Sequence, residues 1–181
     1  MREYTSNSRG RRGFTLVEAV ATMSILAVVS ASASRIIFAA ADAYAADVTR
    51  AELTADLSTA LERITAEVRS LPSRPASPGT PWIDSASATT LNFGGASTLT
   101  LNGSELRLTI GGGATRVLLK DVAAFTLAYF DEANAGLTPP LSGSACDAIR
   151  RVQVTVARTR AGTMETLRTR VYLRAGMGAG S

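Results

Sequence analysis

The feature that most constrains this chain is an apolar stretch close to its N-terminus. From Phe14 to Ser34 the sequence carries a single charged residue, Glu18. As an α-helix these 21 residues would span about 31 Å, and the hydrocarbon core of a bilayer is about 30 Å thick. We therefore expect one membrane-spanning helix over residues 14–34.

Positive charge precedes the apolar stretch. Arg2, Arg9, Arg11 and Arg12 against Glu3 give residues 1–13 a net charge of +3, out of +4 for the whole chain of 181 residues. Positive residues before a span keep that end in the cytoplasm. We therefore expect a single-pass membrane protein with a cytoplasmic N-terminus, whose remaining residues face the periplasm or the outside.

The segment Arg11-Arg12-Gly13-Phe14-Thr15-Leu16-Val17-Glu18 resembles the N-terminus of type IV pilin and pseudopilin precursors. In that family a short basic leader ends in Gly, an aromatic residue or Met follows, and a Glu lies four residues further on. The resemblance implies that residues 1–13 are a leader, that a prepilin peptidase cuts between Gly13 and Phe14, and that the new Phe14 amine is N-methylated. It also implies a protein of the bacterial inner membrane with a periplasmic C-terminal domain. An ordinary secretory signal is excluded, because here the apolar segment follows the cleavage point.

Glu18 needs a physical explanation, since a carboxylate inside a membrane helix costs roughly 2.5–3.5 kcal/mol on insertion scales. Cleavage after Gly13 creates an α-amino group on Phe14. A neighbouring subunit displaced along a filament could place that amine against Glu18, so that both charges are desolvated together and the register between subunits is set. The alternative is a Glu18 carboxylate that is solvated at the cytoplasmic interface.

The helical pattern continues beyond Arg35. Apolar residues recur at steps of three or four residues, which places them on one face of an α-helix: Leu53, Leu57, Leu61, Ile64, Val68 and Leu71. Charged residues mark the opposite, solvent-facing side: Asp56, Glu62, Arg63, Glu67 and Arg69, of which Arg63 and Glu67 have the spacing of a one-turn ion pair. No Gly or Pro interrupts residues 14–71, so we expect one continuous helix whose amphipathic half covers 35–71 and which ends at Pro72.

A two-residue period replaces the helical one after residue 88. Residues 72–88, with four prolines, predict an irregular crossover attached to the core by Trp82 and Ile83. Strands are predicted at 89–93, 97–101, 105–110, 116–120, 123–131, 149–160 and 163–174, with a two-residue turn at Asn102-Gly103 and a long loop at 132–147. The expected fold class is α+β: a long N-terminal helix packed on an antiparallel β-sheet, with residues 72–181 as the β domain.

Composition argues against an enzyme and against a cofactor. The chain has no His, which excludes His-dependent catalysis and imidazole metal sites. Cys146 is the sole cysteine, expected as a buried small residue, with an exposed thiol between chains as the alternative. Asp131, Glu132 and Asp147 bracket the long loop with oxygen ligands suited to calcium, but their spacing matches no calcium-loop pattern, so no metal site is predicted.

The C-terminal strands carry a second resemblance. The series Val122-x-x-Phe125-x-Leu127-x-Tyr129-Phe130-Asp131, then Ile149-Arg150-Arg151-Val152-x-Val154-x-Val156, and a final Val171-Tyr172-Leu173-Arg174 is similar to the minor pseudopilin J of type II secretion and to W-type minor pilins. The absence of a helix-breaking Pro near Arg35 is also more typical of minor subunits. The resemblance implies a low-copy subunit that primes or caps a filament tip, with other minor and major pilins or pseudopilins as partners.

Two alternatives remain open at this point. Arg151, Arg168, Arg170 and Arg174 could form a basic surface that contacts DNA phosphates in an uptake filament, or they could simply be solvated on a sheet face. The chain could instead be a major shaft subunit. Secretion systems, retractile pili and DNA-uptake filaments share this type of N-terminus.

Overall fold

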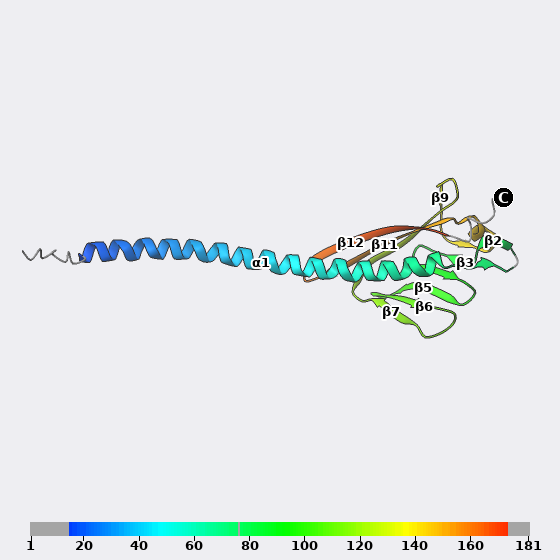
Figure 1. Ribbon diagram of the computed structural model, residues 1–181, viewed down its shortest axis with the longest axis horizontal. Helices are drawn as coiled ribbons and strands as arrows, with labels where there is room; N and C mark the ends of the chain where they lie inside the picture. The colour runs from blue at the N-terminus through cyan, green and yellow to red at the C-terminus, as the bar shows by residue number, and fades with distance from the viewer. Residues whose placement is uncertain (1–14, 76, 174–181) are drawn as a thin grey trace, which may run out of the picture. The chain divides into compact units, whose positions relative to one another are not determined.

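The structure is a computed structural model that describes residues 15–75 and 77–173. The chain divides into two compact units, Met1–Ala45 and Ala46–Ser181. One helix, α1 (Leu16–Arg69), supplies all the regular structure described in the first unit and continues into the second, where every strand lies (Figure 1).

The part of α1 in the second unit buries one stripe of its surface. Leu53 and Leu57 are fully buried, Ile64 and Val68 are 1% exposed, and Leu61 is 7% exposed. These residues follow the predicted helical spacing, so the predicted apolar face is confirmed. The helix ends at Arg69, shortly before Pro72, which cannot continue a helix because it has no backbone N–H. At this end of the helix the Ser70 hydroxyl donates to the Glu67 carbonyl.

Every strand pairing in the domain is antiparallel. A six-stranded sheet has the order β10-β3-β4-β5-β6-β7. Its strands are β10 (Leu141–Ser142), β3 (Ile83–Ala86), β4 (Thr90–Phe93), β5 (Ser97–Asn102), β6 (Glu105–Thr109) and β7 (Arg116–Leu119). A four-stranded sheet has the order β12-β11-β8-β9, from β12 (Thr163–Tyr172), β11 (Arg151–Arg160), β8 (Val122–Phe130) and β9 (Gly136–Leu137).

One apolar core joins α1 to both sheets. Alternating residues of the strands face inward, are buried, and form one cluster with buried residues of the helix. These strand residues are Leu91, Leu99, Leu106, Phe125, Leu127, Tyr129, Val152, Val154 and Val156. Figure 1 shows α1 running across the strands of this domain. The α+β fold class predicted from the sequence is confirmed.

The prediction of an irregular crossover at 72–88 is wrong. This segment contains β1 (Ser73–Arg74), β2 (Ser77–Pro81) and β3, and only β3 belongs to a large sheet. None of the four prolines, at 72, 75, 78 and 81, lies in β3, and those within strands belong to the separate β1–β2 pair. A proline lacks a backbone N–H, and this loss costs little at the edge of such a small sheet. Ile83 is fully buried in β3, as its expected anchoring role requires, while the Trp82 ring packs against Gly95.

The predicted loop at 132–147 is also more ordered than its sequence indicates. It contains β9, β10 and the 3₁₀ helix η1 (Gly143–Ala148). Strand β10 pairs with β3, which lies more than fifty residues earlier in the chain. Two-residue strands of this kind are stabilised by their neighbours and carry no periodic pattern of their own.

The turn between β5 and β6 differs from its prediction by one residue. Asn102 pairs directly with Glu105, so the two central residues are Gly103 and Ser104 rather than Asn102 and Gly103. Gly103 has φ +60°, and of the two central residues it alone adopts a positive φ. That combination is the pattern of a type II′ turn, which places Gly first, rather than the type I′ turn that Asn-Gly favours.

Candidate processing and assembly site

The N-terminus of α1 is capped by its own sequence. The Glu18 backbone N–H donates to the Thr15 hydroxyl at 3.3 Å, and the Ala19 N–H donates to the Thr15 carbonyl at 3.1 Å. Thr15 is therefore the N-cap residue and Glu18 the third residue of the helix, the spacing of a capping box. A carboxylate in the first turn also interacts favourably with the positive end of the helix dipole.

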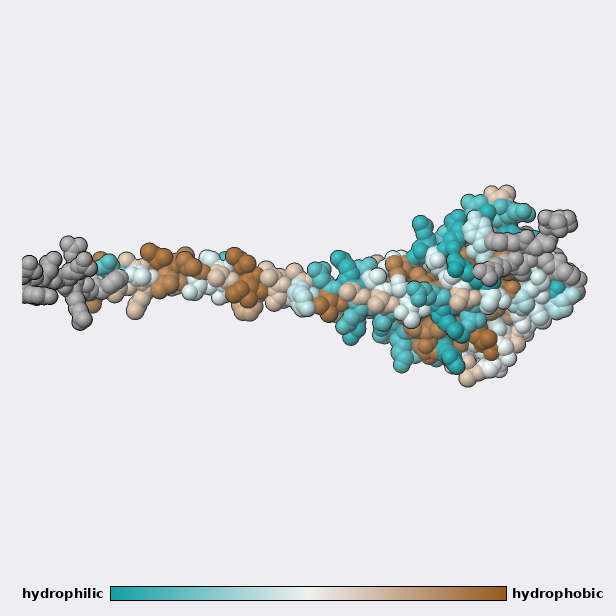
Figure 2. Space-filling view, in the orientation of Figure 1, coloured by the Kyte–Doolittle hydropathy of each residue, from teal (hydrophilic) through white to brown (hydrophobic). Residues whose placement is uncertain are grey.

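The apolar side chains on both sides of Glu18 are uncovered within the first unit. Leu16, Val17, Met23, Ile25 and Val28 are each 65–83% exposed, and α1 is the one described helix long and apolar enough to cross a membrane. Figure 2 shows brown, hydrophobic surface along this segment. Because such a surface is unfavourable in water, it fits a membrane anchor.

Four hydroxyl groups within this stretch have partners inside the helix. Thr22, Ser24, Ser32 and Ser34 each donate to the carbonyl four residues earlier, Ser24 at 2.9 Å and Ser32 at 3.0 Å. A bilayer offers no water to satisfy polar groups, so internal bonding lowers the cost of these residues there. Glu18 is then the one side chain from Leu16 to Ser34 that carries a charge.

Two of the predicted site residues, Gly13 and Phe14, lie outside the described residues. Glu18 lies one helical turn after Thr15 and is exposed. An amine on Phe14 would directly precede the Thr15 cap of the same subunit. The geometry leaves the Glu18 carboxylate available to a group from another chain.

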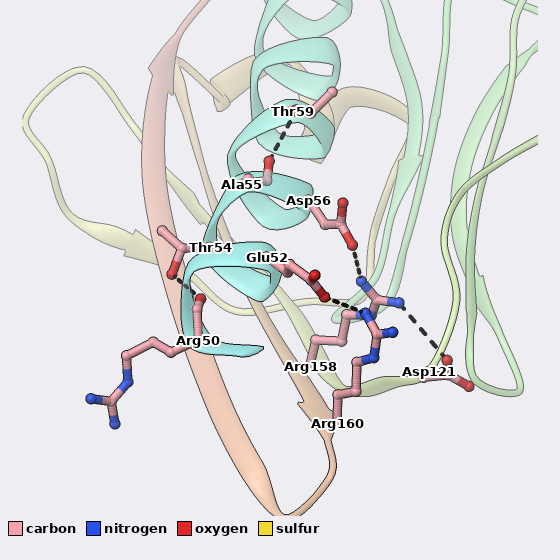
Figure 3. Close-up of polar contacts among 9 residues, drawn as sticks. All are labelled: Arg50, Glu52, Thr54, Ala55, Asp56, Thr59, Asp121, Arg158 and Arg160. Carbon is pink, nitrogen blue, oxygen red and sulfur yellow. Dashed lines mark hydrogen bonds and ion pairs between the residues drawn. The ribbon is translucent and has the colours of Figure 1, made fainter. Parts of the chain in front are cut away.

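Three ion pairs link α1 to the β11–β12 hairpin, and the sequence did not predict them. We call these the helix–hairpin ion pairs. Arg50 Nε lies 2.5 Å from Glu165 Oε1, and Arg160 Nη1 lies 2.9 Å from Glu52 Oε2. The third joins Asp56 to Arg158, whose guanidinium also lies 3.9 Å from Asp121 (Figure 3).

Asp56 lies on the exposed side of α1, as predicted, with 52% of its side chain exposed, but its contact with Arg158 was not predicted. The side chain of Arg158 is only 12% exposed, and its Nε has no hydrogen-bond partner among the residues described. Asp56 supplies its nearest countercharge. By contrast, the predicted one-turn pair between Arg63 and Glu67 is confirmed, at 2.5 Å.

Two of the four arginines of the candidate DNA surface, Arg151 and Arg170, have protein partners, whereas Arg168 is exposed and has none among the described residues. Arg151 donates through Nη1 to Asn134 Oδ1 at 3.0 Å and through Nη2 to the Glu132 carbonyl at 3.2 Å, and its guanidinium stacks on Tyr172 at 4.5 Å. Arg170 donates to the same Asn134 oxygen and stacks on Phe130 at 4.1 Å. These two arginines fasten the loop after β8 onto the sheet, which reduces the number of donors left for phosphates. Arg174 lies outside the described residues.

The carboxylates considered as calcium ligands have separate contacts. Asp131 Oδ1 accepts the Ala135 N–H at 2.7 Å, whereas Asp147 Oδ1 lies 3.3 Å from Arg74 Nη2. Within 15–75 and 77–173 no three acidic or cysteine side chains are grouped to hold a metal ion. Cys146 is fully buried in η1, which confirms the expected buried position.

Comparison with known proteins bears on the N-terminal segment. Residues 8–34 match the family described as the prokaryotic N-terminal methylation motif, and the match includes Gly13, Phe14 and Glu18. No curated protein matches the chain. The motif supports a type IV pilin-like subunit, and it implies processing by a prepilin peptidase and assembly with other pilins.

Proposed function

We propose that this chain is a minor, low-copy subunit that primes or caps a type IV pilus-like or type II secretion filament. In this proposal residues 1–13 are a cytoplasmic leader, 14–34 cross the inner membrane, 35–71 form the amphipathic half of the helix, and 72–181 are a periplasmic domain. One observation carries it: the methylation motif coincides with an exposed apolar helix that begins at a Thr15 cap and bears Glu18 as its single charge up to Arg35.

Glu18 is the proposed register contact. After cleavage and N-methylation the Phe14 amine keeps its positive charge, and it would meet Glu18 of an adjacent subunit in a dry helix bundle. Desolvating one charge alone is expensive, whereas an ion pair offsets part of that cost only in the correct register. The pair would therefore select one axial offset between neighbouring helices.

Two features support a minor rather than a shaft role. Helix α1 is continuous through Arg35. It therefore lacks the helix break that major subunits often carry at this distance from the cleavage site. The β8, β11 and β12 strands follow the pattern shared with the J-type and W-type minor subunits. A subunit at a tip is released from the repeated contact above it, so its loops are free to meet different partners.

Processing is the direct test. The full chain should be expressed with a prepilin peptidase, extracted from membranes and measured by intact mass. We expect a mature chain that starts at Phe14 and carries one added methyl group. Gly13→Val should block cleavage because the enzyme must approach the backbone at that residue, while Gly10→Val in the same leader should be processed normally.

Recruitment is tested with Glu18→Ala on the processed chain. Membrane insertion and the melting temperature of the β domain should not change, because Glu18 lies outside the core of that domain, while co-purification with other filament subunits should fall. Glu18→Gln should behave like Glu18→Ala if charge is the requirement. An intact leader in the presence of active peptidase, or unchanged recruitment of both variants, would contradict the proposal.

A further inference from the structure

Strand β12 is a ten-residue strand with one open edge. Within 15–75 and 77–173 it pairs only with β11, in unbroken register from Arg151–Tyr172 to Arg160–Thr163. A strand of this length presents a row of unpaired backbone N–H and C=O groups, which is a template for another strand. Figure 1 shows β12 in orange next to β11, beside α1.

The core beneath this edge is incompletely covered. The inward residues Val152, Val154 and Val156 of β11 are fully buried, whereas the inward residues Leu167 and Thr169 of β12 are only half-buried. A groove of about 430 Å³ lies here between α1 and β12. It is lined by Ser58, Leu61, Glu62, Thr65 and Arg69 from the helix and by Leu167, Arg168 and Thr169 from the strand. One more strand would continue the sheet and cover Leu167.

The outward face of β12 carries positive charge and no carboxylate, because Glu165, the acidic residue of this strand, lies on the inward face. The outward residues are Met164, Thr166, Arg168, Arg170 and Tyr172. Arg170 bonds to the neutral side chains of Asn134 and Gln153. Arg168 is exposed and has no hydrogen-bond or ion-pair partner among the described residues.

These charges discriminate between occupants. In an antiparallel ladder, residues directly opposite each other lie on the same face of the sheet. A second copy of β12 would bring its own Arg168 and Arg170 to this face and no carboxylate, so like charges would gather there. A strand with acidic residues on its outward face and small apolar residues facing the groove would pair with the arginines and cover Leu167.

We propose that the β12 edge is a strand-addition site for an extended, acidic segment of a different protein. Backbone hydrogen bonds supply the affinity, and Arg168 and Arg170 select acidic over basic or self-derived strands. The inference uses the β domain alone and does not depend on the proposed filament role. Failure of N-terminal processing would leave it intact, and its own failure would leave the processing proposal intact.

The test uses the full chain in detergent micelles and a fluorescent ten-residue peptide that alternates Glu and Val. A peptide that alternates Lys and Val is the charge control. We expect the acidic peptide to bind at least about tenfold more tightly and to protect the β12 amides from hydrogen exchange. Arg168→Glu should weaken its binding about tenfold, since it replaces an attractive cross-strand pair with a repulsive one.

Arg116→Glu is the matched control variant. Arg116 is exposed on β7, the edge strand of the other sheet, and has no ion-pair partner among the described residues, so the same charge change there should alter binding less than about twofold. Two N-methylated peptides test the backbone contacts, because alternate residues of a strand direct their N–H groups to opposite edges. Methylation of one alternate set should abolish binding, and methylation of the other should not.

Several results would overturn the proposal. These are equal binding of the acidic and basic peptides, an equal loss in Arg116→Glu, and equal binding of both methylated peptides. A dimer of the chain without peptide, with protected β12 amides, would identify a second copy as the occupant and would equally overturn it.

Discussion

Cys146 is the residue whose surroundings make the clearest prediction about pH. Burial raises the pKa of its thiol, Asp147 and Asp84 raise it further, and Arg74 partly opposes the change. The native state therefore favours the neutral thiol. This contribution to stability is complete below the thiol pKa of the unfolded chain, about 8.5, and is lost as the pH rises toward the higher native pKa.

We expect the free energy of unfolding of the β domain to fall as the pH rises above about 8.5, before tyrosine titration begins near about 10, with a slope of at most about 1.4 kcal/mol per pH unit. Burial also raises the pKa of Tyr129, but that group begins to contribute only above its ordinary pKa of about 10. Urea denaturation at several pH values measures the slope. Cys146→Ala should flatten the curve in this window, and an unchanged slope in that variant would contradict the assignment.

At the scale of elements, the helix–hairpin ion pairs connect α1 to β11 and β12 with unequal burial. Arg158 is mostly buried, whereas the Arg160–Glu52 pair is exposed by 56% and 54%. Removing the partner of a buried charge leaves that charge uncompensated, but an exposed pair is screened by water. The two pairs therefore differ in their expected effect although they lie side by side in Figure 3.

Asp56→Ala should lower the free energy of unfolding by about 1–2 kcal/mol, since Arg158 would keep only the more distant Asp121. Glu52→Ala is the control on the same helix and should change it by less than about 0.5 kcal/mol. Denaturation of both variants, and of Asp56→Ala combined with Arg158→Ala, isolates the coupling. Equal effects of Asp56→Ala and Glu52→Ala would show that burial of Arg158 does not matter.

At the scale of the whole molecule, the proposed tip role predicts abundance. A shaft subunit must fit a copy of itself above and below, whereas β12 gathers arginines that disfavour a second copy at that edge. We expect this chain to be present far below the most abundant pilin in sheared filaments. Quantitative mass spectrometry gives the ratio, and a value near or above one would make the chain a major subunit without affecting the processing proposal.

Much of the fold was predictable because it depends on local periodicity. The spacing of Leu53, Leu57, Ile64 and Val68 predicted the buried face of α1, and the alternation of Val152, Val154 and Val156 predicted the inner face of β11. The methylation motif was likewise readable, since it is a contiguous segment recognised by an enzyme. These features need no information about which distant residues meet.

Tertiary structure decided what depends on long-range pairing. Strands β9 and β10 are two residues long and exist because β8 and β3 supply their hydrogen bonds. Asp56 and Arg158 are 102 positions apart, so their contact follows from the docking of the hairpin against α1. The sequence by itself determined an apolar helix with one internal carboxylate and an alternating β domain. Only the tertiary structure determined that, within 15–75 and 77–173, no strand lies beside the outer edge of β12, because strand order depends on pairings between residues far apart in the chain.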